Sequence, residues 1–157
     1  MAAVSPTSTL RDEHTLMTTM RKLLKQEQAM LVSADTDSLT AITPQKSQLV
    51  AQLAQLAGQR HQALAAAGFP AQESAMDDYL VQAGDADASS LWHDLLALTR
   101  EAKEFNRVNG MLINKQYQNN QHILNAMRTP AAGAEGGFYG PSGQAVGGGP
   151  SRRYVVG

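Results

Sequence analysis

A long run of residues at alternating steps of four and three positions constrains the fold of this chain more than any other sequence feature. The run consists of Leu91, Leu95, Leu98, Ala102, Phe105, Asn109, Leu112, Gln116, Asn119, Ile123 and Ala126. Such steps place side chains on one face of an α-helix, in the heptad pattern of a coiled-coil seam. Asp85 and Asp87 precede the run, where the helix dipole favours acidic residues, and Thr129-Pro130 follows it. The pattern predicts a helix over about 87–127, roughly 60 Å long.

Helical spacing of apolar residues also predicts a first helix near the N-terminus. Thr9 is followed three residues later by Asp12, which fits the capping-box pattern, so we expect the helix to begin there and to run to about Ala34. Asp12 and the adjacent Glu13 do not face each other on a helix, and we expect both carboxylates to be solvated.

A second long helix is predicted in the middle of the chain. It starts either at Thr43, with Pro44 at the first helical position, or near Asp37, with Pro44 kinking its first turns. Gly68-Phe69-Pro70 ends it, because glycine and then proline commonly follow a helix. We predict a short helix over residues 71–83, which ends at the glycine that follows it, Gly84.

The composition favours helices over sheets, because aromatic residues make up only 5% and Ala, Leu and Gln are abundant. We predict an all-α fold, an antiparallel helical bundle or coiled coil of three long helices plus one short helix. Most of the glycines lie after Pro130, where the chain cannot bury enough apolar surface to offset ordering. The predicted organisation is a helical domain over residues 1–128 and a disordered, flexible Gly-rich tail over residues 129–157.

Several classes of function find no support in the sequence. The net charge of −1 leaves no basic patch for nucleic acid, and cysteine is absent. We find no signal peptide, no membrane span and no catalytic or nucleotide-binding motif, so we expect a cytoplasmic protein that is not an enzyme and needs no cofactor. The histidines do not pair at metal-ligand spacing, and we expect them to be solvated: His14, His61, His93 and His122.

Two positively charged residues, Lys46 and Arg60, fall on the seam of the second helix. We expect their stems to lie along the bundle and their charges to reach water. Gly58 and Gly110 lie inside helical patterns at a cost of about 1 kcal/mol each relative to alanine. Either close approach of another helix or simple tolerance explains them.

The amides in the last helix point to a possible binding surface. Asn109, Gln116 and Asn119 occupy seam positions, and a buried amide without a partner costs about 1–3 kcal/mol. Either these amides fix the register of the bundle, as a single core Asn can, or this half of the helix is a partly exposed groove that binds a partner. In the second case the apolar anchors are Leu112, Ile113, Ile123, Leu124 and Met127.

The last helix also carries a pattern that resembles a known family. Asn106, Asn109-Gly110, Leu112-Ile113, Asn120 and Leu124 resemble the signature of the FlgN family of flagellar export chaperones. Tyr139-Gly140 and the residues up to Gln144 are similar to the Y-G-x-x-G element of that family, and Lys46 and Arg60 fit its second helix. The resemblance covers about residues 10–145, whereas Arg152-Arg153-Tyr154 has no counterpart with a known role.

The resemblance implies a chaperone that binds hook-associated proteins of the hook–filament junction through their C-terminal segments. Such a chaperone prevents premature assembly or aggregation of these clients in the cytoplasm and delivers them to the flagellar type III export apparatus. It further implies that Tyr139 docks on the export-gate platform protein. The client-binding residues expected on this basis are Val108, Met111, Leu112, Ile113, Gln116, Asn119, Asn120, Ile123, Leu124 and Met127. The alternative is a coiled-coil structural or adaptor protein that self-associates through residues 108–127.

Overall fold

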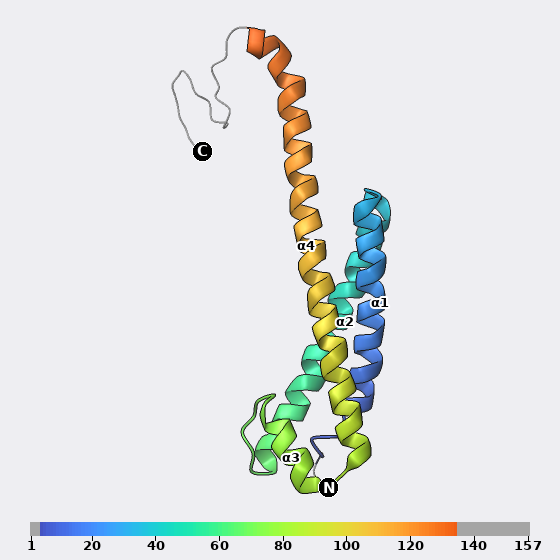
Figure 1. Cartoon of the computed structure of the whole chain (residues 1–157), viewed down its shortest axis with the longest axis vertical. Helices are drawn as coiled ribbons and strands as arrows, with labels where there is room; N and C mark the ends of the chain where they lie inside the picture. Colours follow the sequence, from blue (N-terminus) through green and yellow to red (C-terminus); the bar gives the residue numbers. More distant parts are fainter. Residues whose placement is uncertain (1–3, 135–157) are drawn as a thin grey trace. The chain divides into compact units, whose positions relative to one another are not determined.

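The computed structural model describes the backbone of residues 4–134 and the side chains of residues 4–128. Every regular element in this part of the chain is a helix: α1 (Leu10–Val32), α2 (Thr36–Ala66), α3 (Ala75–Ala83) and α4 (Ala86–Ala134) (Figure 1). The predicted all-α class, with three long helices and one short helix, is confirmed. The chain divides into two compact units, residues 1–112 and residues 113–157, so that the boundary falls within α4.

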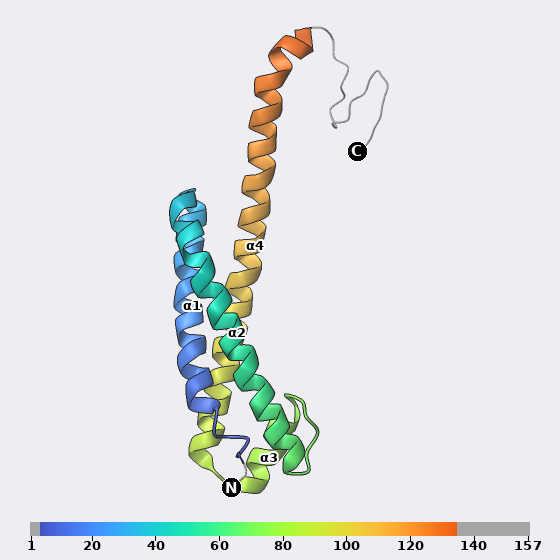
Figure 2. The same cartoon turned by 180° about the vertical axis from the view of Figure 1, so that it is seen from behind.

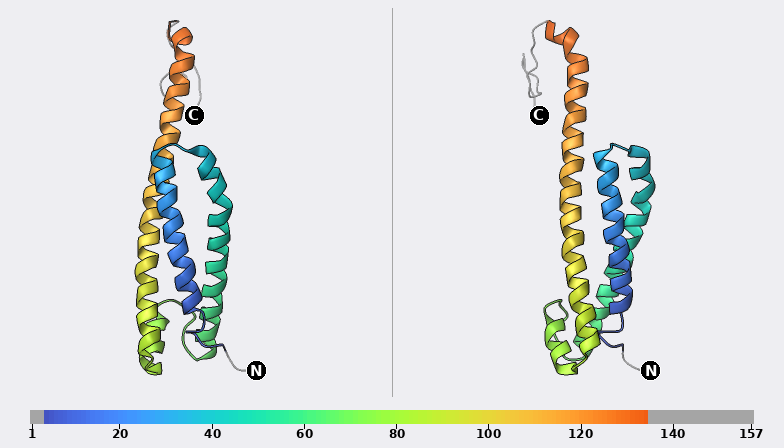
Figure 3. Two further views of the ribbon diagram at one scale, coloured as in Figure 1. Left: turned by 90° about the vertical axis from the view of Figure 1, so that its right-hand side faces the viewer. Right: turned by 45° about the vertical axis from the view of Figure 1, so that its right-hand side comes forward.

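The first unit is a helical bundle. Its helices α1 and α2 run antiparallel, and the N-terminal part of α4 lies beside them in the same direction as α1 (Figures 1 and 2). The short helix α3 lies at the end of the unit where α2 finishes and α4 begins. The connection between α1 and α2 lies at the opposite end (Figure 3). This arrangement is the predicted antiparallel bundle.

Two groups of buried side chains form the core of the first unit. One group, near α3, is made of Leu10, Leu64, Ala75, Met76, Leu80, Ala88, Trp92 and Leu95. The other group, further along α1, is made of Met20, Leu23, Leu24, Ile42, Leu49 and Ala102. Each group draws residues from α1, α2 and α4, because the apolar residues of these helices recur every three or four positions on one face. Burial of these stripes against one another is the main source of stability for the unit.

The N-terminus of α2 decides between the two predicted starts. Asp35 is the N-cap residue, and its Oδ1 accepts a hydrogen bond of 3.1 Å from the backbone N–H of Ser38. The Ser38 hydroxyl also donates to Oδ2 of Asp35, at 2.7 Å. The side-chain and backbone hydrogen bonds from Ser38 together lower the pKa of the Asp35 carboxyl, because they stabilise the charged form. The helix therefore begins at Thr36, close to the earlier of the two predicted starts, and Pro44 lies inside it.

The N-terminus of α1 differs from the prediction in two respects. Thr9 is the N-cap residue, but its side chain makes no capping hydrogen bond to the backbone. Its hydroxyl donates instead to Oε2 of Glu13, at 2.8 Å. The prediction that Glu13 is solvated is wrong, since this residue is only 3% exposed, whereas Asp12 is exposed as expected.

The boundaries around α3 and α4 are mostly as predicted. Gly84 ends α3 in the left-handed conformation, with φ of 67°, and Oδ1 of Asp85 accepts from the N–H of Ala88 at the start of α4. The predicted end of α4 near residue 127 is wrong, because the helix continues to Ala134. Pro130 removes one backbone donor and crowds the carbonyl four residues earlier, and the alanines after it, as the strongest helix formers, offset part of this cost.

Gly58 and Gly110 do not mark a close approach of helices. A Cβ atom added at either residue would meet no atom within 4 Å beyond its own helix. Of the two explanations offered by the sequence, the structure fits the second, that the helices simply tolerate these glycines.

The described part of the second unit is the C-terminal stretch of α4, from Ile113 to Ala134. Its side chains from Ile113 to Arg128 are all exposed apart from Gln116, which is half-buried. The predicted flexible tail lies mostly outside the described residues, which end at Ala134.

Candidate functional site

The C-terminal part of α4 presents a stripe of large apolar side chains. The exposed fractions are 47% for Ile113, 64% for Tyr117, 56% for Ile123, 52% for Leu124 and 73% for Met127. Successive residues of an α-helix are rotated by about 100°, so these five side chains fall within about 120° of one another around the helix axis. We call them the apolar stripe. A soluble helix rarely keeps so continuous an apolar face in water without a partner.

Amides lie within the apolar stripe, and charged groups lie mostly away from it. Gln116 and Asn120 fall between its apolar members, whereas Lys115 and His122 project from the opposite face of the helix. Arg128 lies at one edge, and its Nη2 donates to Oδ1 of Asn125 at 3.1 Å. No acidic residue occurs between positions 113 and 128. The surface thus combines apolar contact area with hydrogen-bonding groups and a slight positive charge.

The apolar stripe has the same helical phase as the face of α4 that is buried in the first unit. Leu95, Leu98 and Ala102 are buried there against α1 and α2. Counting about 100° per residue from these positions leads to Gln116, Asn120 and Met127. In its residue spacing the stripe therefore repeats the pattern of the bundle-forming residues of α4.

The structure places the predicted client-binding residues in three settings. Val108 and Leu112 are half-buried within the first unit, and Met111 is 58% exposed there. Ile113, Ile123, Leu124 and Met127 belong to the stripe, and Gln116 and Asn120 lie among its members. Asn119 lies about 120° around the helix from Ile113, at the flank of the stripe.

Tyr117 is a member of the stripe that sequence reasoning missed. The strict heptad run passes through Gln116 and Asn119, and Tyr117 lies between these positions. A period of 3.6 residues, applied forward from Ile113, would have selected it, because residues separated by four positions share a face. Aromatic residues of this kind are frequent anchors in protein interfaces.

Asn109 does not belong to an exposed groove, and that part of the surface hypothesis is wrong. Asn109 is only 1% exposed, and its Nδ2 donates to the carbonyl of Leu24 at 2.9 Å and to Oε1 of Glu27 at 2.8 Å. Nζ of Lys46 lies 3.2 Å from the same carboxylate. This cluster joins α1, α2 and α4, so Asn109 fixes the register of the bundle, as the alternative interpretation of the seam amides proposed.

The expectation that the Arg60 charge reaches water is also wrong. The side chain of Arg60 is only 3% exposed, and its Nε and Nη2 donate to the two carboxylate oxygens of Glu13, both at 2.9 Å. Nη1 and Nη2 also donate to Glu73, at 3.1 Å, and the guanidinium lies 4.8 Å from the ring centre of Trp92. Burial disfavours the charged form, but the hydrogen bonds that the guanidinium donates to Glu13 and Glu73 outweigh this effect and raise the pKa of Arg60. The ion pairs of Arg60 thus connect α2 with α1 and with the segment before α3. Arg60 is far in the sequence from the stripe.

The histidines do not form a metal site in the described part of the chain. No group of three or more metal-binding side chains occurs there. Nε2 of His61 lies 3.4 Å from Glu73, and Nε2 of His93 lies 3.7 Å from Asp77.

Within the described residues, no helix has the length and apolar character needed to cross a bilayer. Tyr139, the predicted export-gate residue, lies outside the described residues.

Comparison with known proteins identifies the family. The FlgN family, described as FlgN protein, matches residues 1–147. No curated protein and no solved structure matches the chain. The family match spans both the bundle and the apolar stripe, and it confirms the resemblance carried by Asn106, Asn109-Gly110 and the residues that follow. The chain therefore belongs to the FlgN family of flagellar export chaperones.

Proposed function

We propose that this chaperone binds the C-terminal helical segments of hook-associated junction proteins along the apolar stripe of α4. The observation that carries the proposal is the stripe itself, whose five large side chains are each about half or more exposed on one helix face. FlgN-family chaperones bind hook-associated proteins, and half of the ten exposed large apolar side chains in the described part of the chain lie on this stripe. Amphipathic helices bind such faces through residues spaced three and four apart.

The chemistry of the stripe suits a client that must later be released. Fully burying an aliphatic or aromatic side chain contributes about 1.5–3 kcal/mol, so completing the burial of five half-exposed side chains contributes about 4–8 kcal/mol before the cost of association. An interface of this strength favours a complex that dissociates again. Gln116 and Asn120 can hydrogen-bond the client or retain water, which keeps the interface from becoming a dry core. A covered client helix cannot assemble or aggregate through the same face, and the chaperone delivers it to the export apparatus.

We extend the proposal to the tail and to the site of action. Tyr139 lies in a glycine-rich segment, where a single aromatic side chain can provide contact area for a transient complex. The proposed partner is the export-gate platform protein, and the proposed compartment is the cytoplasm, before the client is secreted. Replacement of Tyr139 by alanine should leave client affinity unchanged and reduce secretion of the clients, measured by their amount outside the cells.

The client site is tested by calorimetric titration of the full chain with the C-terminal segment of a hook-associated protein. The Ile123→Ala/Leu124→Ala variant should bind about 30-fold or more weakly, because each truncation removes buried apolar area. The matched control is Lys115→Ala/His122→Ala, which alters the opposite face and should change affinity by less than about threefold. Circular dichroism of both variants checks that α4 stays helical.

Two outcomes would count against the proposed site. Equal loss of binding in the two variants would show that the apolar stripe is not the client surface. Absence of binding by the unaltered chain would favour the alternative, self-association through residues 108–127, which the same stripe could also support. Sedimentation of the Ile123→Ala/Leu124→Ala variant then distinguishes the two, since only self-association through the stripe predicts a smaller particle for that variant.

A further inference from the structure

A second unusual surface lies on α2. Six glutamines follow one another at steps of three and four, and all of them are exposed: Gln45, Gln48, Gln52, Gln55, Gln59 and Gln62. This spacing keeps their side chains within about 100° around the helix, on a single face that extends for about 26 Å. We call it the glutamine face. It shares no residue with the apolar stripe.

The glutamine face lacks the charges that normally solvate an exposed helix. Between Lys46 and Arg60 the sequence of α2 contains no charged residue. Lys46 is paired with Glu27 and Arg60 is buried, so neither places a free charge on this face. The exposed surfaces of the other long helices do carry charges, for example Lys22 and Lys25 on α1 and Arg100 and Lys103 on α4. Depletion of charged residues is typical of the centre of protein interfaces.

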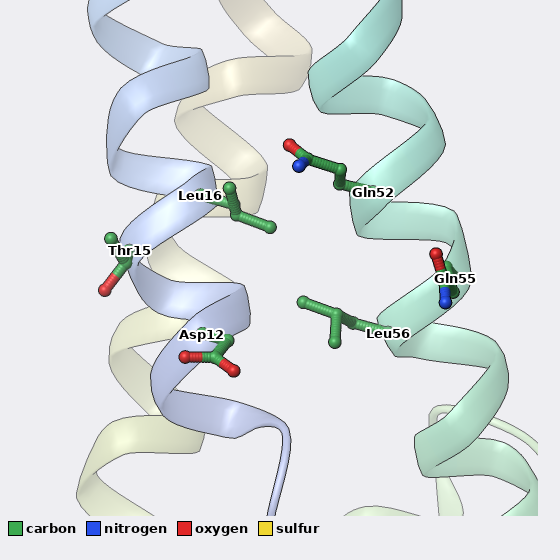
Figure 4. Close-up of a pocket in the computed structure, with 6 residues that line it drawn as sticks. All are labelled: Asp12, Thr15, Leu16, Gln52, Gln55 and Leu56. Atoms are coloured by element: carbon green, nitrogen blue, oxygen red, sulfur yellow. The ribbon is translucent and has the colours of Figure 1, made fainter.

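A hollow in the surface lies beside the middle of the glutamine face. It has a volume of about 320 Å³ and is lined by Gln52, Gln55 and Leu56 of α2 and by Asp12, Thr15 and Leu16 of α1 (Figure 4). Leu16 and Leu56 point toward the space between the two helices and are each half-buried. The centre of the face therefore offers apolar area next to its amides.

We propose that the glutamine face binds the same face of a second copy of this chain, with the two α2 helices antiparallel. The spacing is symmetric about its midpoint, so a two-fold axis there places Gln45 opposite Gln62, Gln48 opposite Gln59 and Gln52 opposite Gln55 of the copy. Each amide has both donors and an acceptor, so a glutamine row is complementary to itself. Between Lys46 and Arg60, α2 brings no charged side chain to the axis. The hollow beside Gln52 and Gln55 lies near the axis and presents two leucines, with the exposed carboxylate of Asp12 at its α1 side.

The same face fits a charged partner less well. A charged helix laid on it would lose hydration without gaining an opposite charge, which is unfavourable. A second copy brings an uncharged face of equal length and matching polarity. The interface is mainly polar, so we expect a dimer that dissociates readily, in the range of the smaller and weaker protein interfaces. The inference is independent of the client site, because the glutamine face and the hollow beside it share no residue with the apolar stripe.

Sedimentation equilibrium of the full chain from about 5 to 500 µM tests the proposal, since weak interfaces associate in this range. We expect a monomer–dimer equilibrium. The Gln52→Glu/Gln55→Glu variant brings four carboxylates together at the axis and should weaken association by about tenfold or more. Gln26→Glu/Gln82→Glu adds the same charge at exposed sites outside the face and should stay within about twofold of the parent chain.

Cross-linking then tests the antiparallel arrangement. The chain has no cysteine, so introduced thiols react without competition. A mixture of Gln45→Cys and Gln62→Cys chains should be linked by a short bismaleimide. A sample that contains only Gln45→Cys chains, or only Gln62→Cys chains, should not be linked. In the antiparallel pair the same residue number in the two copies lies about 26 Å apart along the helices. A monomer at every concentration, a dimer unaffected by Gln52→Glu/Gln55→Glu, or efficient linking of Gln45→Cys chains to one another would overturn the proposal.

Discussion

The ion pairs around Arg60 show how single residues hold the bundle together. Arg60 uses Nε, Nη1 and Nη2 to bind the carboxylates of Glu13 on α1 and Glu73 in the connection before α3. A charge buried in this way is tolerable only because it is paired and hydrogen-bonded. The pKa of Arg60 is raised, so the guanidinium stays protonated throughout its usual titration range. Its contribution to stability is lost only as the pH rises above that range, in strongly alkaline solution.

Replacing Arg60 by alanine should lower the free energy of unfolding by about 3–5 kcal/mol, because Glu13 would remain buried without its partner. Urea denaturation followed by circular dichroism measures the change. The control is Arg21→Ala, which removes an exposed ion pair with Glu101 and should cost less than about 1 kcal/mol. Losses of similar size in the two variants would show that the Arg60 cluster is not a principal tie of the bundle.

Asn109 provides a second test at the same scale. Asn109→Ala should cost about 1–3 kcal/mol of unfolding free energy, because the carbonyl of Leu24 and the Glu27 carboxylate lose a buried donor. Asn106→Ala, one turn earlier on the exposed side of α4, should stay within about 0.5 kcal/mol of the parent chain. If Asn109→Ala behaves like this control in urea denaturation, the amide is not a register device.

The sequence indicated that Arg60 and Asn109 were unusual but did not identify their partners. Both lie on apolar seams, which made them visible as polar residues out of place. Their partners Glu13 and Glu27 are 47 and 82 residues away in the chain. No local pattern connects positions so distant. The sequence alone therefore placed the Arg60 charge in water and left open whether the Asn109 amide fixes the register or lines a groove.

At the scale of the helices, the sequence predicted which segments are helical. It predicted less well which side of α4 carries the apolar residues. Apolar spacing and Gly or Pro signals located α1 to α4, with the main error at the end of α4. A strict repeat of 3.5 residues drifts by about 20° per heptad on a straight helix. Over the length of α4 this drift carried the predicted seam to Asn119 and Ala126, while the apolar side chains continue through Tyr117, Leu124 and Met127.

The glycine inside α2 allows a direct test of helix energetics. Gly58→Ala should raise the free energy of unfolding by about 0.5–1 kcal/mol, because alanine is the better helix former and no atom within 4 Å would obstruct its Cβ. Thermal unfolding measures the gain. Gly84→Ala is the counterpart, since φ of 67° favours glycine there, and it should be destabilising. A loss of stability in Gly58→Ala would mean that α2 needs flexibility or close contact at that position.

At the scale of the whole molecule, the all-α class and the family could be predicted, while the exposed apolar stripe could be predicted only in part. Ile113, Ile123, Leu124 and Met127 were identified from their pattern, and all four are exposed. Exposure of the seam depends on where the other helices end, and helix lengths inferred from sequence are uncertain by several residues. The role of the residues after Ala134 remains a prediction from the family resemblance.

Removal of residues 135–157 should separate the two proposed activities of the chain. Client affinity should change by less than about twofold in calorimetry, because the apolar stripe ends before the deletion. Secretion of the clients should fall, since Tyr139 is lost with the tail. A large loss of client affinity would place part of the client site in the tail and would contradict the assignment to α4.

Hydrogen–deuterium exchange of the full chain, with and without the C-terminal segment of a hook-associated protein, tests the central claim most directly. The account predicts that bound client slows exchange by about tenfold or more across residues 113–127, because covering the stripe suppresses local opening of this part of α4. Amides of α1 and α2 in the bundle should change little. Tight binding accompanied by protection confined to α1 and α2, with residues 113–127 unchanged, would contradict it.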